Sequence, residues 1–336
     1  MQTNINPAIK GGRRVLVTGA GGFIGSHLVE RLIQQGDQVR AFVHYNSRND
    51  WGNLELIDAH VRRSIEVVSG DIADPFSVRH ATKGMQVVYH LSSLIAIPYS
   101  YVAPQSYVNT NVLGAINVLQ AARDEGVERV VHTSTSECYG TATYVPIDEA
   151  HPLQGQSPYS ASKIGADMLA ESYWRSFGLP VAIIRPFNTF GPRQSARAVI
   201  PTIISQALKG GTIKLGSLTP TRDMNYVDNT VDGFVAVGSH PSAVGQIINI
   251  GSGREISVGD LARLIVELVG SNSEVVEDAQ RFRPANSEVE RLLCANAKAE
   301  ALLGWTPKIG LEEGLQRSIE WFRRHLDRYK TDIYNL

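Results

Sequence analysis

The sequence predicts an α/β protein built on a doubly wound parallel sheet, and three observations favour this class. Six short apolar runs rich in β-branched residues alternate with stretches of helical periodicity. A glycine cluster and then a helical stretch follow the first of these runs, which is the order of a βαβ unit. With 336 residues, 43% of them hydrophobic, the chain can bury a core for such a sheet and for an appended lobe.

The predicted strands are continuous apolar runs, as expected for a parallel sheet that is covered on both faces. They lie at Val15–Thr18, Gln38–Val43, Ile65–Ser69, Val87–His90, Arg129–Thr133 and Val181–Arg185. Apolar residues at helical spacing predict helices between them. The clearest of these helices are Phe23–Gln35, Gln105–Glu125 and Ser157–Phe177.

Beyond Arg185 the alternation gives way to turns rich in proline and glycine. We expect residues 1–186, with segments at about 225–250 that return to the sheet, to form a dinucleotide-binding domain. Residues 187–224 and 251–330 would form a smaller substrate-binding lobe. Ser257–Gly270 and Leu311–His325 show helical periodicity within that lobe, where we expect a structural role.

The turn after the first predicted strand reads Thr18-Gly-Ala-Gly-Gly-Phe-Ile-Gly25. Gly19 and Gly22 permit backbone angles and a close approach that a Cβ would prevent, and Gly25 lets the helix pack tightly on the strand. The start of the helix would direct unpaired N–H groups and its positive dipole end toward a phosphate. Between a strand and a helix, this motif predicts a site for the pyrophosphate of a dinucleotide.

A second motif, Tyr159-Ser-Ala-Ser-Lys163, begins the predicted helix in the middle of the chain. Residues four apart share a helix face, so the Lys163 ammonium should lie beside the Tyr159 phenol. An adjacent cation favours the phenolate, and we therefore expect the pKa of Tyr159 to be lowered toward neutrality. Thr135 follows a predicted strand and should reach the same cleft at the carboxyl edge of the sheet. Together the two motifs predict hydride transfer to or from a hydroxyl-bearing substrate.

Composition excludes several other classes. The net charge of −1 gives no reason to expect nucleic acid or an anionic membrane as a partner. Cys138 and Cys294 lie in unrelated contexts, so we expect neither a disulfide framework nor a metal site. The chain has no run of eighteen apolar residues, and the polar segment Met1–Lys10 lacks the apolar stretch of a signal peptide. A cytoplasmic location is therefore expected.

The motifs resemble those of the extended short-chain dehydrogenases/reductases, the group of nucleotide-sugar epimerases, dehydratases and decarboxylases. Matching segments run along nearly the whole chain. Besides the two motifs above, they are Gly70–Ile72, His90–Ser93, Asn111–Asn117, Thr135–Gly140, Arg185–Gly191, Arg222–Asp228 and Leu303–Pro307. The resemblance implies a Rossmann-type sheet and a nucleotide-sugar substrate.

The resemblance also implies a nicotinamide dinucleotide that stays tightly bound and is recycled. Its expected contacts are Gly19, Gly22, Phe23, Ile24, Gly25, Asp71, Ile72, Leu91, Ser92, Ser93, Tyr159, Lys163 and Pro186. Members that bind NAD carry an acidic residue near the end of the second strand, but Arg40–Arg48 contains none. Arg48 would instead suit a 2′-phosphate, together with His44, Asn46 and Ser47, so NADP is favoured over NAD.

The type of reaction depends on Thr135, Ser136 and Glu137. In the family the residue at the Thr135 position binds the sugar hydroxyl beside the tyrosine, whereas 4-epimerases usually carry small neutral residues at the next two places. Oxidation of C4 acidifies the hydrogen at C5, and Glu137 could remove it while water leaves from C6. We therefore expect a 4,6-dehydratase whose catalytic residues are Thr135, Ser136, Glu137, Tyr159 and Lys163. A UDP-sugar 4-epimerase and a UDP-glucuronate decarboxylase are the alternatives.

A finer resemblance suggests the substrate. Five segments are similar to the N-acetylglucosamine 4,6-dehydratases of the bacterial legionaminic-acid pathway, which act on UDP- or GDP-linked sugar; they are Ala41–Ser47, Leu94–Tyr101, Gln154–Tyr159, Gln194–Pro201 and Ser287–Arg291. Related enzymes clamp the diphosphate with arginines at the positions of Arg222 and Arg283, because a guanidinium binds phosphate with two N–H groups. Asn188 is also expected to approach the phosphates.

The resemblance further implies a homodimer. Two helices, Gln105–Glu125 and Ser157–Phe177, are similar to the pair that forms a four-helix interface in this family. Apolar and small residues on them would suit close packing between helices. They are Val112, Ala115, Ile116, Ala166 and Ala170.

Overall fold

The computed structural model describes residues 12–331 and 333–334, and its central feature is a parallel sheet of seven strands in the order β10-β6-β5-β4-β1-β2-β3. All six predicted strands are present, each within one residue of its expected limits. The bounds are β1 (Arg14–Thr18), β2 (Gln38–His44), β3 (Glu66–Gly70), β4 (Val87–His90), β5 (Arg129–Thr133), β6 (Val181–Pro186) and β10 (Ile247–Ile250). The strand order reverses between β1 and β4, which confirms the doubly wound class.

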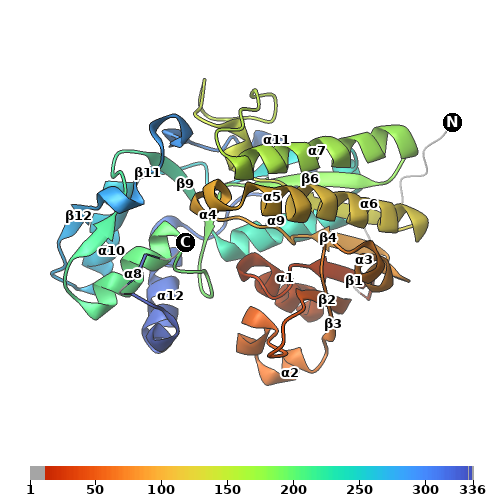
Figure 1. Cartoon of the computed structure of the whole chain (residues 1–336), viewed down its shortest axis with the longest axis horizontal. Helices are drawn as coiled ribbons and strands as arrows, with labels where there is room; N and C mark the ends of the chain where they lie inside the picture. The colour runs from red at the N-terminus through yellow and green to blue at the C-terminus, as the bar shows by residue number, and fades with distance from the viewer. Residues whose placement is uncertain (1–11, 332, 335–336) are drawn as a thin grey trace.

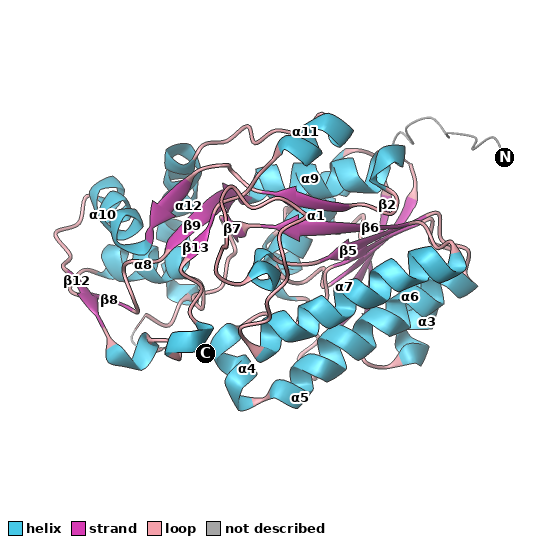
Figure 2. Cartoon of the chain, turned by 90° about the horizontal axis from the view of Figure 1, so that it is seen from above, coloured by secondary structure: helices cyan, strands magenta, loops and turns pink. Residues whose placement is uncertain are grey.

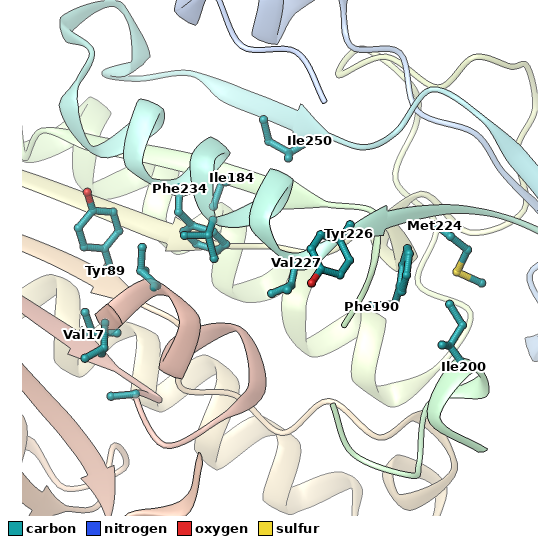
Figure 3. Close-up of a cluster of buried hydrophobic side chains, with 14 of the residues drawn as sticks. Val17, Tyr89, Ile184, Phe190, Ile200, Met224, Tyr226, Val227, Phe234 and Ile250 are labelled. Carbon is teal, nitrogen blue, oxygen red and sulfur yellow. The ribbon is translucent and has the colours of Figure 1, made fainter. Parts of the chain in front are cut away.

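Helices cover both faces of this sheet (Figure 2). One face carries α1 (Phe23–Gln34) and α9 (Val227–Ser239), and the other carries α3 (Pro75–Thr82), α6 (Gly114–Asp124) and α7 (Pro158–Phe177). Successive residues of a strand therefore enter different cores. Val15 and Val17 belong to the larger hydrophobic cluster, part of which Figure 3 shows, whereas Leu16 belongs to the second. Burial on both faces explains why the strands read as unbroken apolar runs.

Local sequence fixes the start and the end of α7. The Ser157 hydroxyl accepts a hydrogen bond from the Ser160 amide at 3.1 Å, and the Ser160 hydroxyl accepts one from the Ser157 amide at 3.0 Å, so the two serines form a reciprocal cap. Pro158 occupies the first turn, and Gly178 ends the helix in the left-handed conformation with φ of +67°. These signals place Tyr159 and Lys163 in the first two turns.

The remaining strands lie at the other end of the molecule from β1–β3 (Figure 1). Strands β7 (Asn188–Phe190), β9 (Thr221–Tyr226), β11 (Glu255–Ser257) and β13 (Arg291–Leu292) form a four-stranded sheet, and β8 (Ile213–Leu215) pairs with β12 (Val275–Glu277). Three helices accompany them, namely α8 (Val199–Lys209), α10 (Val258–Val269) and α12 (Leu311–Arg324). As expected, the chain returns to the large sheet through α9 and β10.

The predicted helix Gln105–Glu125 is not a single regular helix. It comprises α5 (Pro104–Tyr107), a π-helical segment (Val108–Leu113) and α6. Such distortions occur often near functional sites. The shorter helices of the chain are α2 (Ala59–Arg62), α4 (Ile97–Val102) and α11 (Ala297–Leu303).

The alanines expected at a dimer interface lie inside the subunit. Ala115, Ala166 and Ala170 are fully buried within the single chain. Because the alanine side chain is short, these positions let the chain's own helices and sheet approach closely. These three alanines therefore have no exposed surface that could contact a partner. The large apolar side chains that do reach the surface of these helices are those of Val108, Leu113, Met168 and Phe177.

None of the described helices is both long and apolar enough to cross a membrane. The polar segment Met1–Lys10, used above to predict location, lies outside the described residues.

Candidate active site

The glycine turn joins β1 to α1 and is shaped by close backbone packing. Gly19 has φ of +70°, and a Cβ at this position would lie 2.8 Å from the Leu91 carbonyl carbon and the Ser92 nitrogen. A Cβ on Gly25 would overlap the Gly19 carbonyl oxygen. No side chain caps the N-terminus of α1 at Gly22. Phe23 and Ile24 begin α1, so the helix offers uncapped amides, and this arrangement fits the pyrophosphate of a dinucleotide.

The segment after β4 is anchored to this turn. The Thr18 hydroxyl accepts hydrogen bonds from the amides of Leu91 and Ser92 at 3.1 and 3.2 Å. Ser93 donates its hydroxyl proton to the Asn111 side chain at 3.0 Å. Leu91, Ser92 and Ser93 thus line the carboxyl edge of the sheet beside the glycine turn, where open α/β sheets bind ligands.

The loop after β2 carries the residues expected to select the cofactor. His44, Ser47 and Arg48 are exposed. Asn46 has a structural function here, because its side-chain oxygen accepts from the amides of Arg48 and Asp50, both at 3.1 Å, and its amide donates to the Asp50 carbonyl. Asn46 thereby holds the turn that presents Arg48 to solvent.

The other predicted cofactor residues lie at strand ends of the same sheet. Asp71 follows β3, is exposed, and accepts a hydrogen bond from the Ala73 amide at 2.9 Å. Ile72 is buried and packs closely on Gly114 of α6. A Cβ at Gly114 would lie only 3.1 Å from the Ile72 side chain. Pro186 is the last residue of β6 and is buried.

Thr135, Tyr159 and Lys163 meet where β5 ends and α7 begins. Tyr159 and Lys163 are 7% and 4% exposed, so both are shielded from bulk water. The Thr135 hydroxyl hydrogen-bonds to the Tyr159 phenol. Lys163 Nζ donates to the Thr133 carbonyl oxygen at 2.5 Å. The structure therefore brings together the hydroxyl, phenol and ammonium that the sequence placed in one cleft.

The expectation of a lowered pKa for Tyr159 was wrong. Burial raises the pKa of Tyr159, and the Thr135 hydrogen bond opposes this rise only in part, while the nearby Cys138 and Glu137 add to it. The cost of placing a phenolate in a dry site exceeds the benefit of a cation one helical turn away. The phenol is thus protonated at neutral pH.

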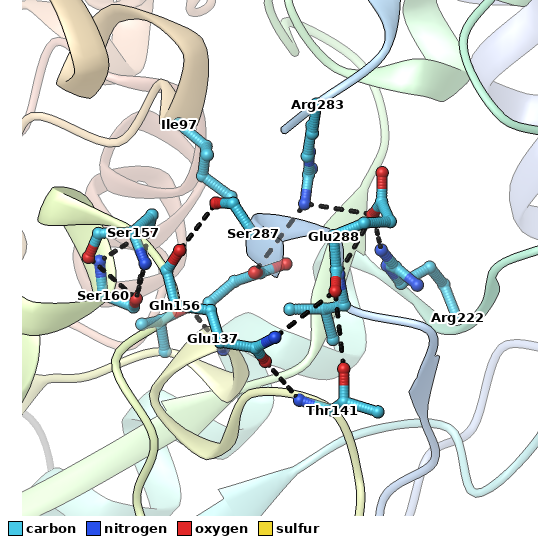
Figure 4. Close-up of polar contacts among 12 residues, drawn as sticks. Ile97, Glu137, Thr141, Gln156, Ser157, Ser160, Arg222, Arg283, Ser287 and Glu288 are labelled. Atoms are coloured by element: carbon cyan, nitrogen blue, oxygen red, sulfur yellow. Dashed lines mark hydrogen bonds and ion pairs between the residues drawn. The ribbon is translucent and has the colours of Figure 1, made fainter. Parts of the chain in front are cut away.

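Ser136 and Glu137 lie in a buried 3₁₀ helix, Ser136–Tyr139, which Thr135 caps by accepting a hydrogen bond from the Glu137 amide. Glu137 is 9% exposed, and its Oε2 lies 3.9 Å from Arg283 Nη1 (Figure 4). The Glu137 charge also acts on Tyr159 and on Arg222. The charge of this carboxylate is therefore felt by the tyrosine and by both arginines.

Arg222 on β9 and Arg283 in the segment before β13 share one carboxylate that was not assigned from the sequence. Glu288 Oε1 lies 3.1 Å from Arg222 Nη2 and 3.4 Å from Arg283 Nη1 (Figure 4). Arg283 Nη1 is buried without a hydrogen bond of good geometry. Two arginines converging on one anion form a site that fits a phosphate-bearing ligand. The sequence signals for Glu288 are its position five residues after Arg283 and its place in the resembling segment Ser287–Arg291.

Two further residues bear on the site. Asn188 Oδ1 is buried without a hydrogen-bond partner among the described residues, which suits a group that a ligand completes. Asn111, in the π-helical segment, bonds to the Leu94 amide and carbonyl and to the Ser162 hydroxyl. Sequence analysis did not assign Asn111, although a buried asparagine in a helix indicates a local network.

Within residues 12–331 and 333–334, no group of three or more His, Cys, Asp or Glu side chains is arranged to hold a metal ion. Both cysteines of the chain are free and buried.

The known proteins to which this chain is similar include nucleotide-sugar dehydratases, epimerases and decarboxylases. The GDP-mannose 4,6 dehydratase family profile matches residues 16–318. UDP-glucose 4-epimerase of Mycolicibacterium smegmatis is 36% identical over 318 residues, which cover 92% of this chain and 98% of that protein. UDP-glucuronic acid decarboxylase 1 of Xenopus tropicalis is 32% identical over 336 residues, which cover 96% of this chain and 75% of that protein.

Among solved structures, DesIV of Streptomyces venezuelae, a dTDP-glucose 4,6-dehydratase crystallised with NAD, superimposes with a TM-score of 0.85. It is 31% identical, and the match covers 94% of this chain and 99% of that one. The glycine turn, the Tyr159–Lys163 pair and the converging arginines are thus found in a chain that matches these enzymes over nearly its whole length. This chain belongs to the extended short-chain dehydrogenase/reductase family of NAD-dependent nucleotide-sugar 4,6-dehydratases and epimerases.

Proposed function

We propose that this chain is a nucleotide-sugar 4,6-dehydratase that converts UDP- or GDP-linked N-acetylglucosamine to the 4-keto-6-deoxy sugar. The observation that carries the proposal is the position of Glu137. Its carboxylate lies 3.9 Å from Arg283, in the Arg222–Arg283 pair where a diphosphate would bind. It is also close enough to the Tyr159 phenol, where C4 would be oxidised, for its charge to raise the pKa of Tyr159. A hexose bound between these two ends would place C5 beside Glu137.

Each residue then has a proposed task. A bound nicotinamide would accept the hydride from C4 and later return it to C6. Tyr159, hydrogen-bonded to Thr135, takes the proton of the C4 hydroxyl in its phenolate form. Burial disfavours this form, and the positive charges of Lys163 and of a bound nicotinamide would favour it. Arg222 and Arg283 bind the diphosphate and orient the sugar, with Asn188 beside them.

Elimination follows from the acidity that the C4 ketone gives to C5. Glu137 takes the C5 proton, the C5–C6 double bond forms, and the C6 hydroxyl leaves as water after protonation by Tyr159 or by a water held at Ser136. When C6 receives its hydride, Glu137 can return a proton to C5. The balance is the loss of one water from the sugar with no net oxidation.

Mass spectrometry of the incubated nucleotide sugar tests the proposal. The enzyme is given UDP-N-acetylglucosamine and, separately, the GDP-linked sugar, with NAD or NADP added. Loss of one water from either sugar is the expected result and identifies the nucleotide. An unchanged mass with inverted C4 would assign a 4-epimerase. Inertness toward both sugars, with loss of carbon dioxide from UDP-glucuronate, would assign a decarboxylase.

We propose further that Arg48 makes the enzyme favour NADP, although DesIV was crystallised with NAD. Arg48 is exposed on a turn that Asn46 holds in place. The carboxylate of the nearby Asp50 accepts a hydrogen bond from the Gly52 amide at 2.6 Å. Arg48→Ala should weaken NADP binding about tenfold or more, the value of one lost charge-assisted hydrogen bond, and leave NAD binding unchanged. Calorimetric titration of both cofactors measures this, and equal losses for both would contradict it.

Finally, we propose a homodimer formed through α5–α7 and the π-helical segment. Leu113 and Met168 are 48% and 44% exposed there. Leu113→Glu should raise the dimer Kd about tenfold or more, because it would bury an unpaired charge. Phe76→Glu, at an 82% exposed position on α3, is the matched control. Sedimentation equilibrium measures both, and a monomeric wild-type protein at micromolar concentration would contradict the proposal.

A further inference from the structure

A network of buried polar side chains surrounds Asp167, one helical turn after Lys163 on α7. Asp167 is fully buried, and its Oδ2 accepts hydrogen bonds from Arg185 Nη2 at 2.9 Å and from the Ser134 hydroxyl. Its Oδ1 lies 3.2 Å from His132 Nε2. Three segments of the chain, α7, β5 and β6, thus meet on one carboxylate.

Arg185 connects this carboxylate to the loop that carries Thr135 and Glu137. Its Nε donates to the Ser134 hydroxyl at 3.2 Å and its Nη1 to the Tyr139 hydroxyl at 3.0 Å. Ser134 precedes Thr135, and Tyr139 ends the 3₁₀ helix that contains Glu137. The network therefore touches both sides of the candidate catalytic loop.

Burial alone does not explain these charges, because a buried ion pair is often no more stabilising than apolar residues of the same size. Asp167 and Lys163 are four apart on α7, so they share a face, and both are buried. Without this carboxylate, Lys163 would be an ammonium taken out of water with the Thr133 backbone carbonyl as its hydrogen-bond acceptor.

We propose that Asp167 is the buried counter-ion of Lys163 and a positioning residue of the hydride-transfer site, held in place by Arg185, His132 and Ser134. This rests on the proposed function only through its first step, proton removal from the C4 hydroxyl, which the dehydratase, epimerase and decarboxylase alternatives share.

The other titratable groups around Lys163 are neutral or cationic. Burial lowers the pKa of both His90 on β4 and His132 on β5, so these imidazoles carry no charge at pH 7. Burial raises the pKa of Cys138 to about 12, which keeps its thiol protonated. Arg185 is a cation. Burial raises the pKa of the Tyr139 phenol, the Arg185 charge lowers it in part, and the net result is a rise to about 12, so this phenol is neutral. Among the described groups that act on Lys163, Asp167 is the anion.

The direction of the effect follows from these charges. Burial lowers the pKa of Lys163, and the Asp167 carboxylate opposes that fall. Burial also disfavours the Asp167 carboxylate, but the His132 hydrogen bond and the Arg185 charge hold its pKa at about 2, so it is ionised at all working pH values. Without Asp167, the Lys163 ammonium should lose its proton at lower pH.

The test is a direct titration of Lys163 in the full-length protein. The chain has eight lysines, so ¹³C NMR of protein labelled at the lysine ε-carbon gives few signals, and loss of a signal in Lys163→Met assigns Lys163. Asp167→Asn should lower the titration midpoint of Lys163 by about 1–3 pH units. Asp37→Asn is the matched control, because Asp37 forms a buried ion pair with Arg13 at 3.1 Å elsewhere in the sheet, and it should leave the midpoint unchanged.

A second variant separates a specific charge effect from general damage to the core. Arg185→Met also breaks the buried pair, but it leaves the anion, so the Lys163 midpoint should stay or rise. An unshifted midpoint in Asp167→Asn, or equal downward shifts in both variants, would overturn the proposal. If Asp167→Asn does not fold, the double variant with Arg185→Met, which removes both members of the Asp167–Arg185 pair, should still lower the midpoint.

The titration needs no substrate, so its outcome is independent of which sugar the enzyme accepts. With an active substrate, the alkaline limb of the kcat profile should also move to lower pH in Asp167→Asn, whereas a purely structural defect would lower kcat equally at every pH.

Discussion

Replacing Tyr159 by phenylalanine should lower kcat by about a hundred- to ten-thousand-fold, the usual contribution of a positioned acid–base group. The variant removes the hydroxyl that bonds to Thr135 and keeps the ring, which packs against Ile97 and Tyr107. We therefore expect the fold and the binding of the nucleotide sugar to be preserved. Steady-state kinetics with the sugar identified by mass spectrometry measures the loss.

Tyr107→Phe is the matched control for this prediction. Its ring lies 6.2 Å from the Tyr159 ring, and its hydroxyl donates to the Ala96 carbonyl oxygen. Losing this single hydrogen bond should cost about 1 kcal/mol of folding free energy and leave kcat within a few-fold of wild type. If both variants lost activity equally, the effect would belong to the packing of the aromatic cluster and Tyr159 would have no specific chemical role.

Glu137→Gln should separate the two halves of the proposed reaction. Glutamine keeps the size and the hydrogen-bonding capacity of the side chain but cannot take a proton, so water loss should fall by about a hundred- to ten-thousand-fold. Oxidation at C4 does not involve Glu137 and should persist. The two measurements are deuterium uptake at C5 from heavy water, which should be lost, and the absorbance of the reduced cofactor, which should still appear.

Glu288→Gln provides the comparison, because Glu288 shares the same arginines without lying beside Tyr159. This variant should change KM, since it alters the charge that Arg222 and Arg283 present to a diphosphate, and it should leave C5 exchange in place. Undiminished exchange in Glu137→Gln would remove Glu137 from the role of base and assign removal of the C5 proton to another group.

The parts of the fold that depend on residues close together in the chain could be predicted from the sequence. Strands β1 and β4–β6 are apolar at most of their buried positions because both faces of the sheet are covered, and their limits were predicted within one residue. The buried polar residues of these strands, Thr18, His90, His132 and Arg185, lie toward their carboxyl ends. The start of α7 is fixed by Ser157 and Ser160 and its end by Gly178, all of which act over a few residues. The glycine turn is equally local. The position of the Tyr159–Lys163 pair in the first two turns of α7 was therefore predicted correctly.

The errors and omissions have a common cause. The pKa of Tyr159 depends on how completely other segments exclude water from it, and the alanines of α6 and α7 could face a partner or the chain's own core. Neither property is visible in a helix taken alone. The π-helical segment likewise serves Asn111, whose partners Leu94 and Ser162 lie elsewhere in the chain.

The sequence by itself determined the parallel sheet, the dinucleotide turn, the candidate acid–base pair and the family, because periodicity, capping and glycine spacing are properties of adjacent residues. Only the tertiary structure decided which charges meet. Glu137 and Arg283, Glu288 and Arg222, and Asp167 and Arg185 are brought together by the order of the strands and by the return of the chain from the four-stranded sheet region. Ion pairing depends on distance and burial in space, and spacing along the chain fixes neither.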